Sequence, residues 1–195
     1  MNCHDFRLFF DVSCICIRIN SGEPEATFSC YHIDMFMTDQ EKFMKAAILQ
    51  AKKAGTLKEA PIGCVIVHEG RIISRGYNRR EIDQDVTLHA EMIAIRKACR
   101  VLGSWRLEDC DLYVTLEPCY MCAATMIQAR IRHVYFGADD LKGGAVVSKN
   151  TLFDLSHNHR ITYTGGILKE ACSSILSDFF RELREEKKRH RESTK

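Results

Sequence analysis

The sequence predicts an α/β protein, with one mixed sheet of about five strands and helices on both faces. Three observations lead to this fold class. Four segments carry apolar residues at helical spacing, short apolar runs rich in Val, Ile and Tyr lie between them, and turn residues separate the two kinds of segment. Helices that alternate with strands along a chain cover both faces of a sheet. The 195 residues suffice for one domain with a sizeable core.

The predicted elements follow one another from residue 38 onward. They are a helix over 39–55, strands over 64–67 and 71–74, a helix from 89, a strand over 111–116, a helix from 118, a strand over 132–136, a helical turn over 152–155, a strand over 161–164 and a helix from 167. A capping box at Thr38–Glu41 starts the first helix, and Glu69–Gly70 forms the turn between the first two strands. Pro118 suits the first turn of a helix, where a missing N–H costs nothing. Trp105, in a connection, is predicted to be a packing residue, the alternative being a platform on which a base stacks.

Composition places the chain among globular proteins. Hydrophobic residues make up 46% and charged residues 28%, and no apolar run reaches the ~20 residues of a membrane-spanning helix. The net charge of +2 is uneven: residues 1–36 hold two basic and five acidic side chains, whereas residues 181–195 hold seven basic and four acidic ones. A basic C-terminal end fits either a solvated helix end or contact with an anionic partner such as RNA.

The ten cysteines do not read as a disulfide framework. Cys64, Cys99, Cys110 and Cys172 each lie alone in an apolar segment, where a free cysteine behaves as a small buried hydrophobe. Two others stand at C-x-x-C spacing, which is typical of metal binding. This usage predicts a reducing, cytoplasmic environment.

Residues 1–36 differ from the rest of the chain. They carry four of the ten cysteines and no amphipathic period, and Asp11 interrupts the apolar run that a signal peptide would need. We predict a poorly structured extension, or an upstream reading of the start codon with Met35 or Met37 as the natural first residue. The alternative is an appendage with a function of its own. The folded, chemically active domain is predicted over residues 37–195.

Two short motifs carry the chemistry. His89 and Glu91 lie two positions apart in Leu-His-Ala-Glu, and 26 residues separate Glu91 from Pro-Cys-Tyr-Met-Cys, which holds Cys119 and Cys122. One imidazole and two thiols suit Zn²⁺. No fourth Cys or His lies near either motif at the spacing of zinc fingers. The set therefore predicts a catalytic zinc site, in which a fourth position is kept for water.

The combination of H-x-E and P-C-x-x-C is the signature of zinc-dependent deaminases that act on nucleobases. Zinc lowers the pKa of bound water from about 15.7 towards about 7, so that hydroxide can attack an sp² carbon bearing an amino group. Glu91 is positioned to carry protons from this water to a ring nitrogen and to the departing ammonia. The alternative reading of Glu91 is a first-turn carboxylate that interacts only with the helix dipole.

Beyond these motifs, several segments resemble the bacterial tRNA-specific adenosine deaminases, a family within the cytidine deaminase superfamily. The likeness runs from about residue 40 to about residue 190. The segments that carry it are Gly76–Arg79, Leu88–Glu91, Thr115–Cys122, Phe136–Asp140, Asn158–Arg160 and Asp178–Arg181.

The resemblance implies a cytidine-deaminase-like three-layer α/β/α sandwich. It also implies a cytoplasmic homodimer that converts adenosine to inosine at the wobble position (34) of an arginine tRNA anticodon loop, where an unpaired base can be flipped into a pocket. His89, Cys119 and Cys122 would hold one zinc ion per subunit, and Glu91 would be catalytic. The residues implied to contact the substrate or the RNA are Asn78, Ala90 through its backbone, Asp140, Lys142, His159, Phe180 and Arg181.

Two other hypotheses stay open. A deaminase of a free base or nucleoside, such as guanine or cytosine, would share the zinc motif without needing the basic tail. A non-catalytic, zinc-stabilised RNA-binding protein would tolerate loss of Glu91. The chain also departs from the family: residues 1–36 have no counterpart, and Gly144–Asn150 replaces a stretch that usually contains Gly-Ser before a large apolar residue. The second departure leaves RNA contacts or a dimer edge at that loop open.

Overall fold

The computed structural model describes residues 14–17, 29–32 and 37–193, and the chain divides into two compact units, Met1–Thr38 and Asp39–Lys195. In the first unit, strands β1 (Cys14–Ile17) and β2 (Ser29–His32) pair antiparallel. The rest of the predicted extension lies outside the described residues. Its poor order and the later start codon stay predictions.

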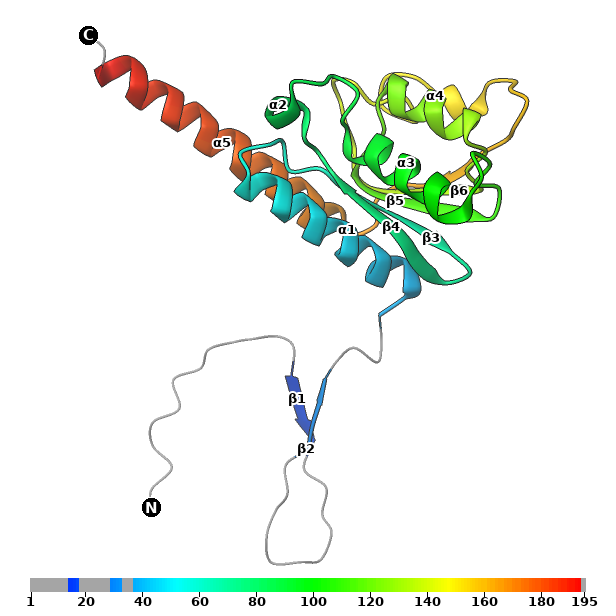
Figure 1. Ribbon diagram of the computed structural model, residues 1–195. Helices are drawn as coiled ribbons and strands as arrows, with labels where there is room; N and C mark the ends of the chain where they lie inside the picture. Colours follow the sequence, from blue (N-terminus) through cyan, green and yellow to red (C-terminus); the bar gives the residue numbers. More distant parts are fainter. Residues whose placement is uncertain (1–13, 18–28, 33–36, 194–195) are drawn as a thin grey trace, which may run out of the picture. The chain divides into compact units, whose positions relative to one another are not determined.

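The second unit contains a five-stranded mixed sheet with the strand order β4-β3-β5-β6-β7 (Figure 1). The middle strand β5 is antiparallel to β3 and parallel to β6, and β7 continues the parallel half. This arrangement confirms the predicted mixed sheet. The strands are β3 (Gly63–His68), β4 (Arg71–Tyr77), β5 (Cys110–Leu116), β6 (His133–Ala138) and β7 (Thr162–Thr164).

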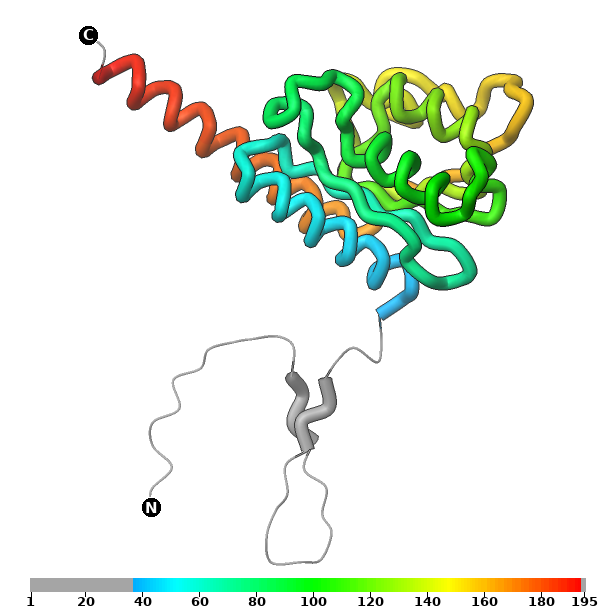
Figure 2. Tube along the Cα trace, in the orientation of Figure 1, coloured from blue at the N-terminus to red at the C-terminus, as the bar shows by residue number. Residues whose placement is uncertain are grey.

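Helices cover both faces of this sheet, as the α/β/α sandwich requires. Helices α1 (Asp39–Thr56) and α5 (Lys169–Ser193) lie side by side on one face, while α3 (Ala90–Leu102) and α4 (Tyr120–Gln128) lie on the other (Figures 1 and 2). A 3₁₀ turn, η2, spans Leu152–Asp154. No helix in the described part of the chain is long and apolar enough to cross a membrane.

The core consists of two clusters, one on each face, because successive strand residues point to opposite sides. Cys64 and Ile66 of β3 belong to the cluster under α3 and α4, whereas Val65 and Val67 belong to the cluster under α1 and α5. All four side chains are buried. Burial on both faces explains why β3 is a continuous apolar run rather than an alternating one.

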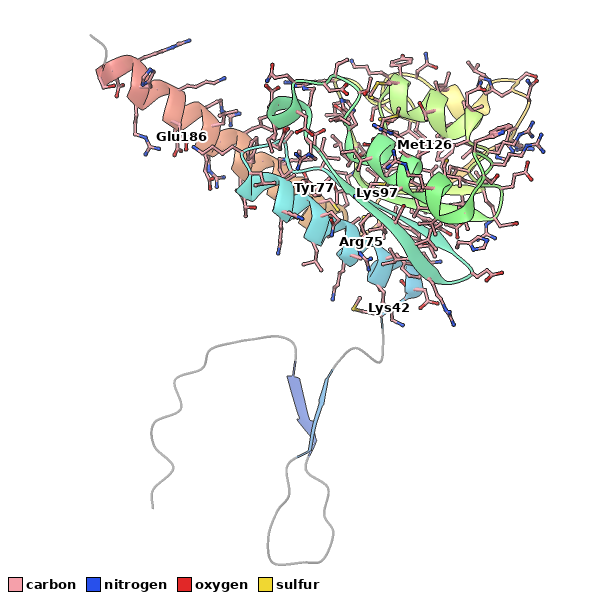
Figure 3. The ribbon with its side chains drawn as sticks, viewed as in Figure 1. Lys42, Arg75, Tyr77, Lys97, Met126 and Glu186 are labelled. Atoms are coloured by element: carbon pink, nitrogen blue, oxygen red, sulfur yellow. The ribbon has the colours of Figure 1, made fainter. Side chains whose placement is uncertain are left out.

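Two glycines allow helices to pack directly against the backbone of the sheet, α3 at β4 and α1 at β3. A Cβ at Gly76 in β4 would stand 2.1 Å from the carbonyl oxygen of Ala90, so the first turn of α3 packs onto bare backbone there. A Cβ at Gly63 in β3 would meet the Ala47 carbonyl oxygen of α1 at 2.1 Å. Lys97 of α3 also donates to the Arg75 carbonyl oxygen at 3.0 Å (Figure 3). The start of α3 is thereby fixed against the end of β4.

Three details differ from the sequence prediction. Helix α2 (Arg80–Asp83) lies between the predicted strand over 71–74 and the predicted helix from 89, where no element was predicted; it has no buried residue and so no apolar period to reveal it. Pro118 is not in the first helical turn, because Cys119 is the N-cap of α4 and Pro118 precedes it. Trp105 is 59% exposed rather than packed, since it follows the end of α3 and stacks near the Arg106 guanidinium.

Candidate active site

The start of α3 and the start of α4 bring the three predicted metal ligands together. His89 is the N-cap residue of α3 and Cys119 is the N-cap residue of α4, each with extended backbone angles. Neither side chain makes a capping hydrogen bond, so both are available for coordination. Cys122 follows in the first turn of α4 and is buried. The prediction that both motifs lie at helix N-termini is confirmed.

The ligand atoms have the separation that a zinc ion requires. His89 Nδ1 lies 3.7 Å from Cys119 Sγ and 3.6 Å from Cys122 Sγ, and all three atoms lie within 4.8 Å of one another. A tetrahedral zinc ion with bonds of about 2.0–2.3 Å separates its ligand atoms by about 3.3–3.8 Å. One imidazole and two thiols therefore fit zinc in both chemistry and geometry, and they leave a fourth position for water.

The two thiols differ in how readily they ionise. Hydrogen bonding by Cys122 and by His89 lowers the pKa of Cys119 to about 4, although burial opposes this shift. The pKa of Cys122 is raised, because Cys122 gives its hydrogen bond to Cys119 and is desolvated. Hydrogen bonding to Cys119 also raises the pKa of His89. Ionisation of Cys119 is thus favoured over that of Cys122, and because zinc binds cysteines as thiolates, metal binding releases protons.

Glu91 lies two positions after His89, in the first turn of α3, and is only 4% exposed. Burial raises the pKa of this carboxyl group, although a backbone hydrogen bond and the charge of His89 act in the other direction. Cys64 of β3 is close enough that burial and the charge of Glu91 together raise the pKa of that thiol. A carboxyl group whose pKa moves towards neutrality can both accept and return a proton, as general acid–base catalysis requires.

A second buried carboxylate lies on the other side of the cysteine motif. Glu117, 2% exposed, accepts backbone N–H bonds from Asp140 (3.0 Å), Val146 (3.0 Å), Val147 (2.7 Å) and Ser148 (2.9 Å), and it accepts the Ser148 hydroxyl. Although burial opposes it, these hydrogen bonds hold the pKa of Glu117 below its usual value. Glu117 is thus a fixed anion that gathers the loop after β6.

The gathered loop packs directly against the cysteine motif. The Ala145 N–H donates to the Pro118 carbonyl oxygen at 2.9 Å, and Gly144 forms a β-bridge with Cys119. A Cβ at Gly144 would stand 2.3 Å from the Glu117 carboxylate, so the loop and the carboxylate fit only because this residue is glycine. In the loop that departs from the family pattern, the backbone rather than the side chains carries these contacts.

Ala90 directly follows His89 at the start of α3, and Asn78 is linked to the same segment through its neighbour Arg79. Asn78 directly follows β4 and is 5% exposed, and its side-chain amide donates to Glu59 Oε2 at 3.0 Å. The next residue, Arg79, donates its N–H to the Leu88 carbonyl oxygen at 3.0 Å, which joins the end of β4 to the segment before His89. Asn78, predicted to contact the base, is therefore tied to the chain that carries the first ligand.

The other predicted RNA-contacting residues fall into two places. Asp140 and Lys142 of the loop line one hollow of about 420 Å³ together with Phe180 of α5, which is 42% exposed. Arg181 is exposed and pairs with Asp178 at 2.6 Å.

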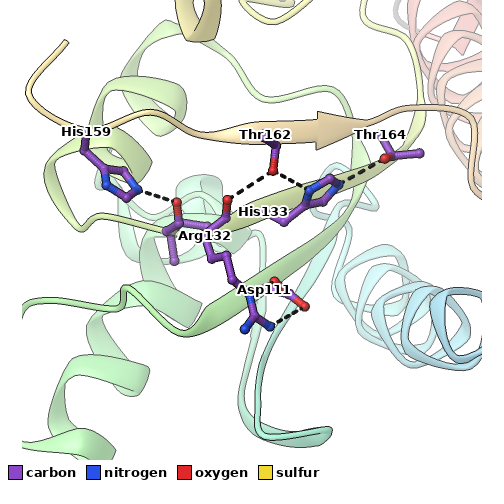
Figure 4. A network of polar contacts seen from close by, with 7 residues as sticks. Asp111, Arg132, His133, His159, Thr162 and Thr164 are labelled. Atoms are coloured by element: carbon purple, nitrogen blue, oxygen red, sulfur yellow. Dashed lines mark hydrogen bonds and ion pairs between the residues drawn. The ribbon is translucent and has the colours of Figure 1, made fainter.

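His159 lies elsewhere: its Nε2 bonds to the Ile131 carbonyl oxygen at 2.8 Å, beside the Arg132–Asp111 ion pair (Figure 4). It lines a separate hollow with Trp105 and Arg130.

Two residues of the site were not assigned roles from the sequence. Glu117 follows an apolar strand directly, and a charged residue at the end of a buried run was the one available signal. Glu59, which is fully buried and holds Asn78, lies in a polar connection after α1 and gave no signal at all. Both bind partners that are far away in sequence, so spacing could not reveal them.

The fold and the His-Cys-Cys cluster beside a buried carboxyl group define the class of protein: a zinc-dependent deaminase of the cytidine deaminase fold. Residues 37–138 match the family model described as the cytidine and deoxycytidylate deaminase zinc-binding region. Comparison with curated proteins shows that the chain belongs to the family of tRNA-specific adenosine deaminases. It is 49% identical to that of Bacillus subtilis (strain 168) over 158 residues, which cover 80% of this chain and 98% of the relative. It is 47% identical to that of Agrobacterium fabrum over 149 residues, covering 76% and 98%.

Solved structures agree with this assignment. A structure from a study of A-to-I editing by tRNA:A34 deaminases aligns with a TM-score of 0.67 and 47% identity, covering 69% of this chain and 99% of that one. Guanine deaminase from Bacillus subtilis aligns with a TM-score of 0.51 and 37% identity, covering 62% and 80%. Guanine deaminase from Nitrosomonas europaea, 21% identical with a TM-score of 0.59, shares the fold.

Proposed function

We propose that this protein is a tRNA adenosine deaminase that hydrolyses adenosine to inosine at the wobble position (34) of an anticodon loop and releases ammonia. The observation that carries the proposal is the 49% identity to a tRNA-specific adenosine deaminase, 98% of whose length is covered. In addition, the two metal motifs of this chain come together in one cluster of His89, Cys119 and Cys122. Zinc supplies the Lewis acidity that makes water a nucleophile near neutral pH.

In this reaction water adds to C6 of adenine, the C6–N bond breaks, and ammonia leaves. Glu91 takes one proton from the attacking water and delivers it to the ring nitrogen, and then carries the proton of the hydroxyl group added at C6 to the departing amino group. Its buried position, which raises the pKa of the carboxyl group, suits a residue that alternates between the two protonation states. His89, Cys119 and Cys122 would hold the metal, and Glu91 lies two positions after the first of these ligands.

The base enters the site by leaving the stacked anticodon loop, which is cheaper for an unpaired base than for a paired one. Asn78 hydrogen-bonds the purine, and the backbone of Ala90, at the start of α3, reads the base edge. Gly76 lets that backbone lie flat on β4 and supports this placement.

The flanking RNA contacts the surface made by the loop after β6 and by α5. The hollow shared by Asp140, Lys142 and Phe180 supports this part, because it combines a cation, a hydrogen-bonding carboxylate and an exposed aromatic ring. Arg181 continues that surface along α5. His159 contributes from its own hollow beside the end of β6.

The substrate is an arginine tRNA, and the enzyme acts as a cytoplasmic homodimer. The family resemblance supports this choice of tRNA, the homodimer and the cytoplasmic location, and the basic character of residues 181–195 is consistent with an RNA partner. Oligomeric state is measured by analytical ultracentrifugation, and tRNA choice by comparing tRNAs that carry adenosine at the wobble position.

A free-base deaminase is the second candidate, because guanine deaminase from Bacillus subtilis shares 37% identity over 80% of its length. The decisive experiment incubates purified protein with an arginine tRNA carrying wobble adenosine, and separately with adenosine, guanine, cytidine and cytosine. Inosine in the tRNA, read as G after reverse transcription, with no ammonia from the small substrates supports the proposal. Ammonia from a free base with unedited tRNA favours the second candidate. No product with zinc bound would leave a non-catalytic RNA-binding protein.

A further inference from the structure

Glu59 is a fully buried carboxylate outside the metal cluster. It lies in the connection between α1 and β3, after Lys58 in the left-handed conformation (φ 60°), and its own N–H donates to the Ala54 carbonyl oxygen at 3.1 Å. Burying a carboxylate is costly unless hydrogen bonds compensate it. Two bonds do so: Oε2 accepts the Asn78 side-chain amide at 3.0 Å, and Oε1 accepts the Ile82 N–H at 2.7 Å.

The bond to Asn78 has a consequence for which atoms this residue presents. The two ends of an asparagine amide are nearly equal in size, so the group can rotate by half a turn and exchange its oxygen and nitrogen at little steric cost. A carboxylate offers acceptors only. Beside Glu59, therefore, only the orientation that turns Nδ2 towards the carboxylate makes a hydrogen bond, and the reverse orientation sets two oxygens against each other.

We propose that Glu59 is a positioning residue that fixes the amide orientation of Asn78 for recognition of the purine. The inference rests on the contact proposed above between Asn78 and the base. The backbone of Asn78 is already fixed, since its N–H donates to the Ile62 carbonyl oxygen at 3.1 Å. The amide rotation is thus the remaining freedom of this side chain, and Glu59 removes it before substrate arrives.

The second bond of Glu59 extends its action to the segment between Asn78 and His89. Helix α2 has no buried residue and no side-chain N-cap, and the ion pair between Asp83 and Arg79 at 2.7 Å joins it only to its own N-cap residue. The Ile82 N–H bond anchors that helix to the same carboxylate that orients Asn78. One buried group therefore couples the base-contacting amide to the segment that leads to the first metal ligand.

The first test is Glu59→Gln, which keeps the side-chain size and can still accept the Ile82 N–H. Its amide nitrogen would face Asn78 and favour the reversed orientation. We expect kcat/KM on tRNA to fall by about tenfold or more, the factor associated with loss of one hydrogen bond to a charged group. Zinc content should be unchanged. Glu108→Gln is the matched control, because Glu108 is exposed and lies 3.7 Å from Arg130 in a surface pair.

A double-mutant cycle separates positioning from a general structural role. If Glu59 acts through Asn78, Glu59→Gln added to Asn78→Ala changes kcat/KM less than about twofold further, because coupled residues are non-additive. Effects that multiply fully in the double variant would overturn the proposal. If Glu59→Gln lowers the folded fraction, Glu59→Asp replaces it in the cycle, since it keeps the charge but withdraws the carboxylate by one methylene.

The cycle also separates this proposal from the proposed function. Unchanged kcat/KM in Asn78→Ala, with wild-type editing intact, would refute the purine contact and the role of Glu59 while leaving the deaminase assignment in place. If the wild-type protein forms no inosine in the tRNA, the proposed function itself is refuted.

Discussion

Glu91 and Glu117 are both buried glutamates close in sequence to a metal ligand, but their surroundings shift the pKa values of their carboxyl groups in opposite directions. Glu91 lies two residues after the ligand His89, and Glu117 lies two residues before the ligand Cys119. Both are nearly inaccessible, at 4% and 2% exposure. Burial dominates at Glu91 and raises the pKa of its carboxyl group, whereas hydrogen bonds outweigh burial at Glu117 and lower its pKa.

The comparison shows that distance from the metal ligand does not decide the role of a carboxylate. What decides it is the number of donors aimed at it. Four backbone N–H groups and one hydroxyl stabilise the anion of Glu117, and these hydrogen bonds hold the loop after β6. Burial keeps the two protonation states of Glu91 closer in energy, which is the property that a proton carrier needs.

The largest expected effect comes from Glu91→Gln. Without a group to move protons, kcat on tRNA should fall by about 10²–10⁴-fold, the usual contribution of general acid–base catalysis. Zinc content, measured by elemental analysis, and the unfolding midpoint should stay close to wild type. Loss of zinc together with activity would show that Glu91 is a metal ligand instead, and the comparison with Glu117 would fail.

Glu117→Gln should show the reverse pattern. The amide retains one acceptor oxygen, so several of the five donors lose their partner, and we expect the free energy of unfolding to fall by about 1–3 kcal/mol. Chemical denaturation measures this change, and hydrogen exchange should speed up at the amides of residues 146–148. At temperatures where the variant is folded, kcat should fall much less than in Glu91→Gln. An equally large loss of kcat without loss of stability would mean that Glu117 takes part in chemistry.

Gly144→Ala tests the Glu117 half of the comparison from the other side. The new methyl group would stand 2.3 Å from the carboxylate, so the loop must shift, and overpacking of this kind costs about 1–3 kcal/mol. Gly55→Ala, in α1, is the control, because the added Cβ would have only Pro61 nearby, at a van der Waals distance of 3.6 Å. Equal unfolding midpoints for the two variants would argue against a tight fit between the loop and Glu117.

The contrast between these residues also marks how far the sequence could predict the site. His89, Cys119, Cys122 and Glu91 were predictable, because helix periodicity placed both motifs at helix starts and their chemistry is local in sequence. The role of Glu117 was not. Its donors come from 23 to 31 residues away, and all but the Ser148 hydroxyl are backbone N–H groups, which every residue except proline carries.

The fold divides in the same way. The sheet and the four long helices were predictable from apolar patterns, since α1, α3 and α4 each bury several apolar residues, and α5 buries Cys172 and packs Ile175 against the core. Helix α2 buries nothing and left no pattern. Trp105 was misassigned because residue type favours burial while its position after α3 leaves it 59% exposed. Tertiary position overrides local preference where few contacts are made.

The smallest expected effect concerns His133 of β6. This residue tests whether burial also shifts the pKa of a basic group towards its neutral form, as it does for the acidic group of Glu91. Burial favours the neutral form in both residues, so it raises the pKa of Glu91 and lowers the pKa of His133 below 6.5, although Asp111 opposes the latter shift. The ring nitrogens bond to the hydroxyls of Thr162 at 2.6 Å and Thr164 at 3.0 Å (Figure 4).

Because the unfolded chain binds this proton more tightly, the stability that His133 contributes is complete above its unfolded pKa and is lost as the pH falls through 6.5 towards the folded pKa. Denaturant unfolding between about pH 5 and pH 8 measures the slope, and His133→Gln should flatten it slightly. A steeper slope in the variant would mean that the folded protein prefers the charged ring. Burial would then not be what sets protonation there, and its use to explain Glu91 would lose support.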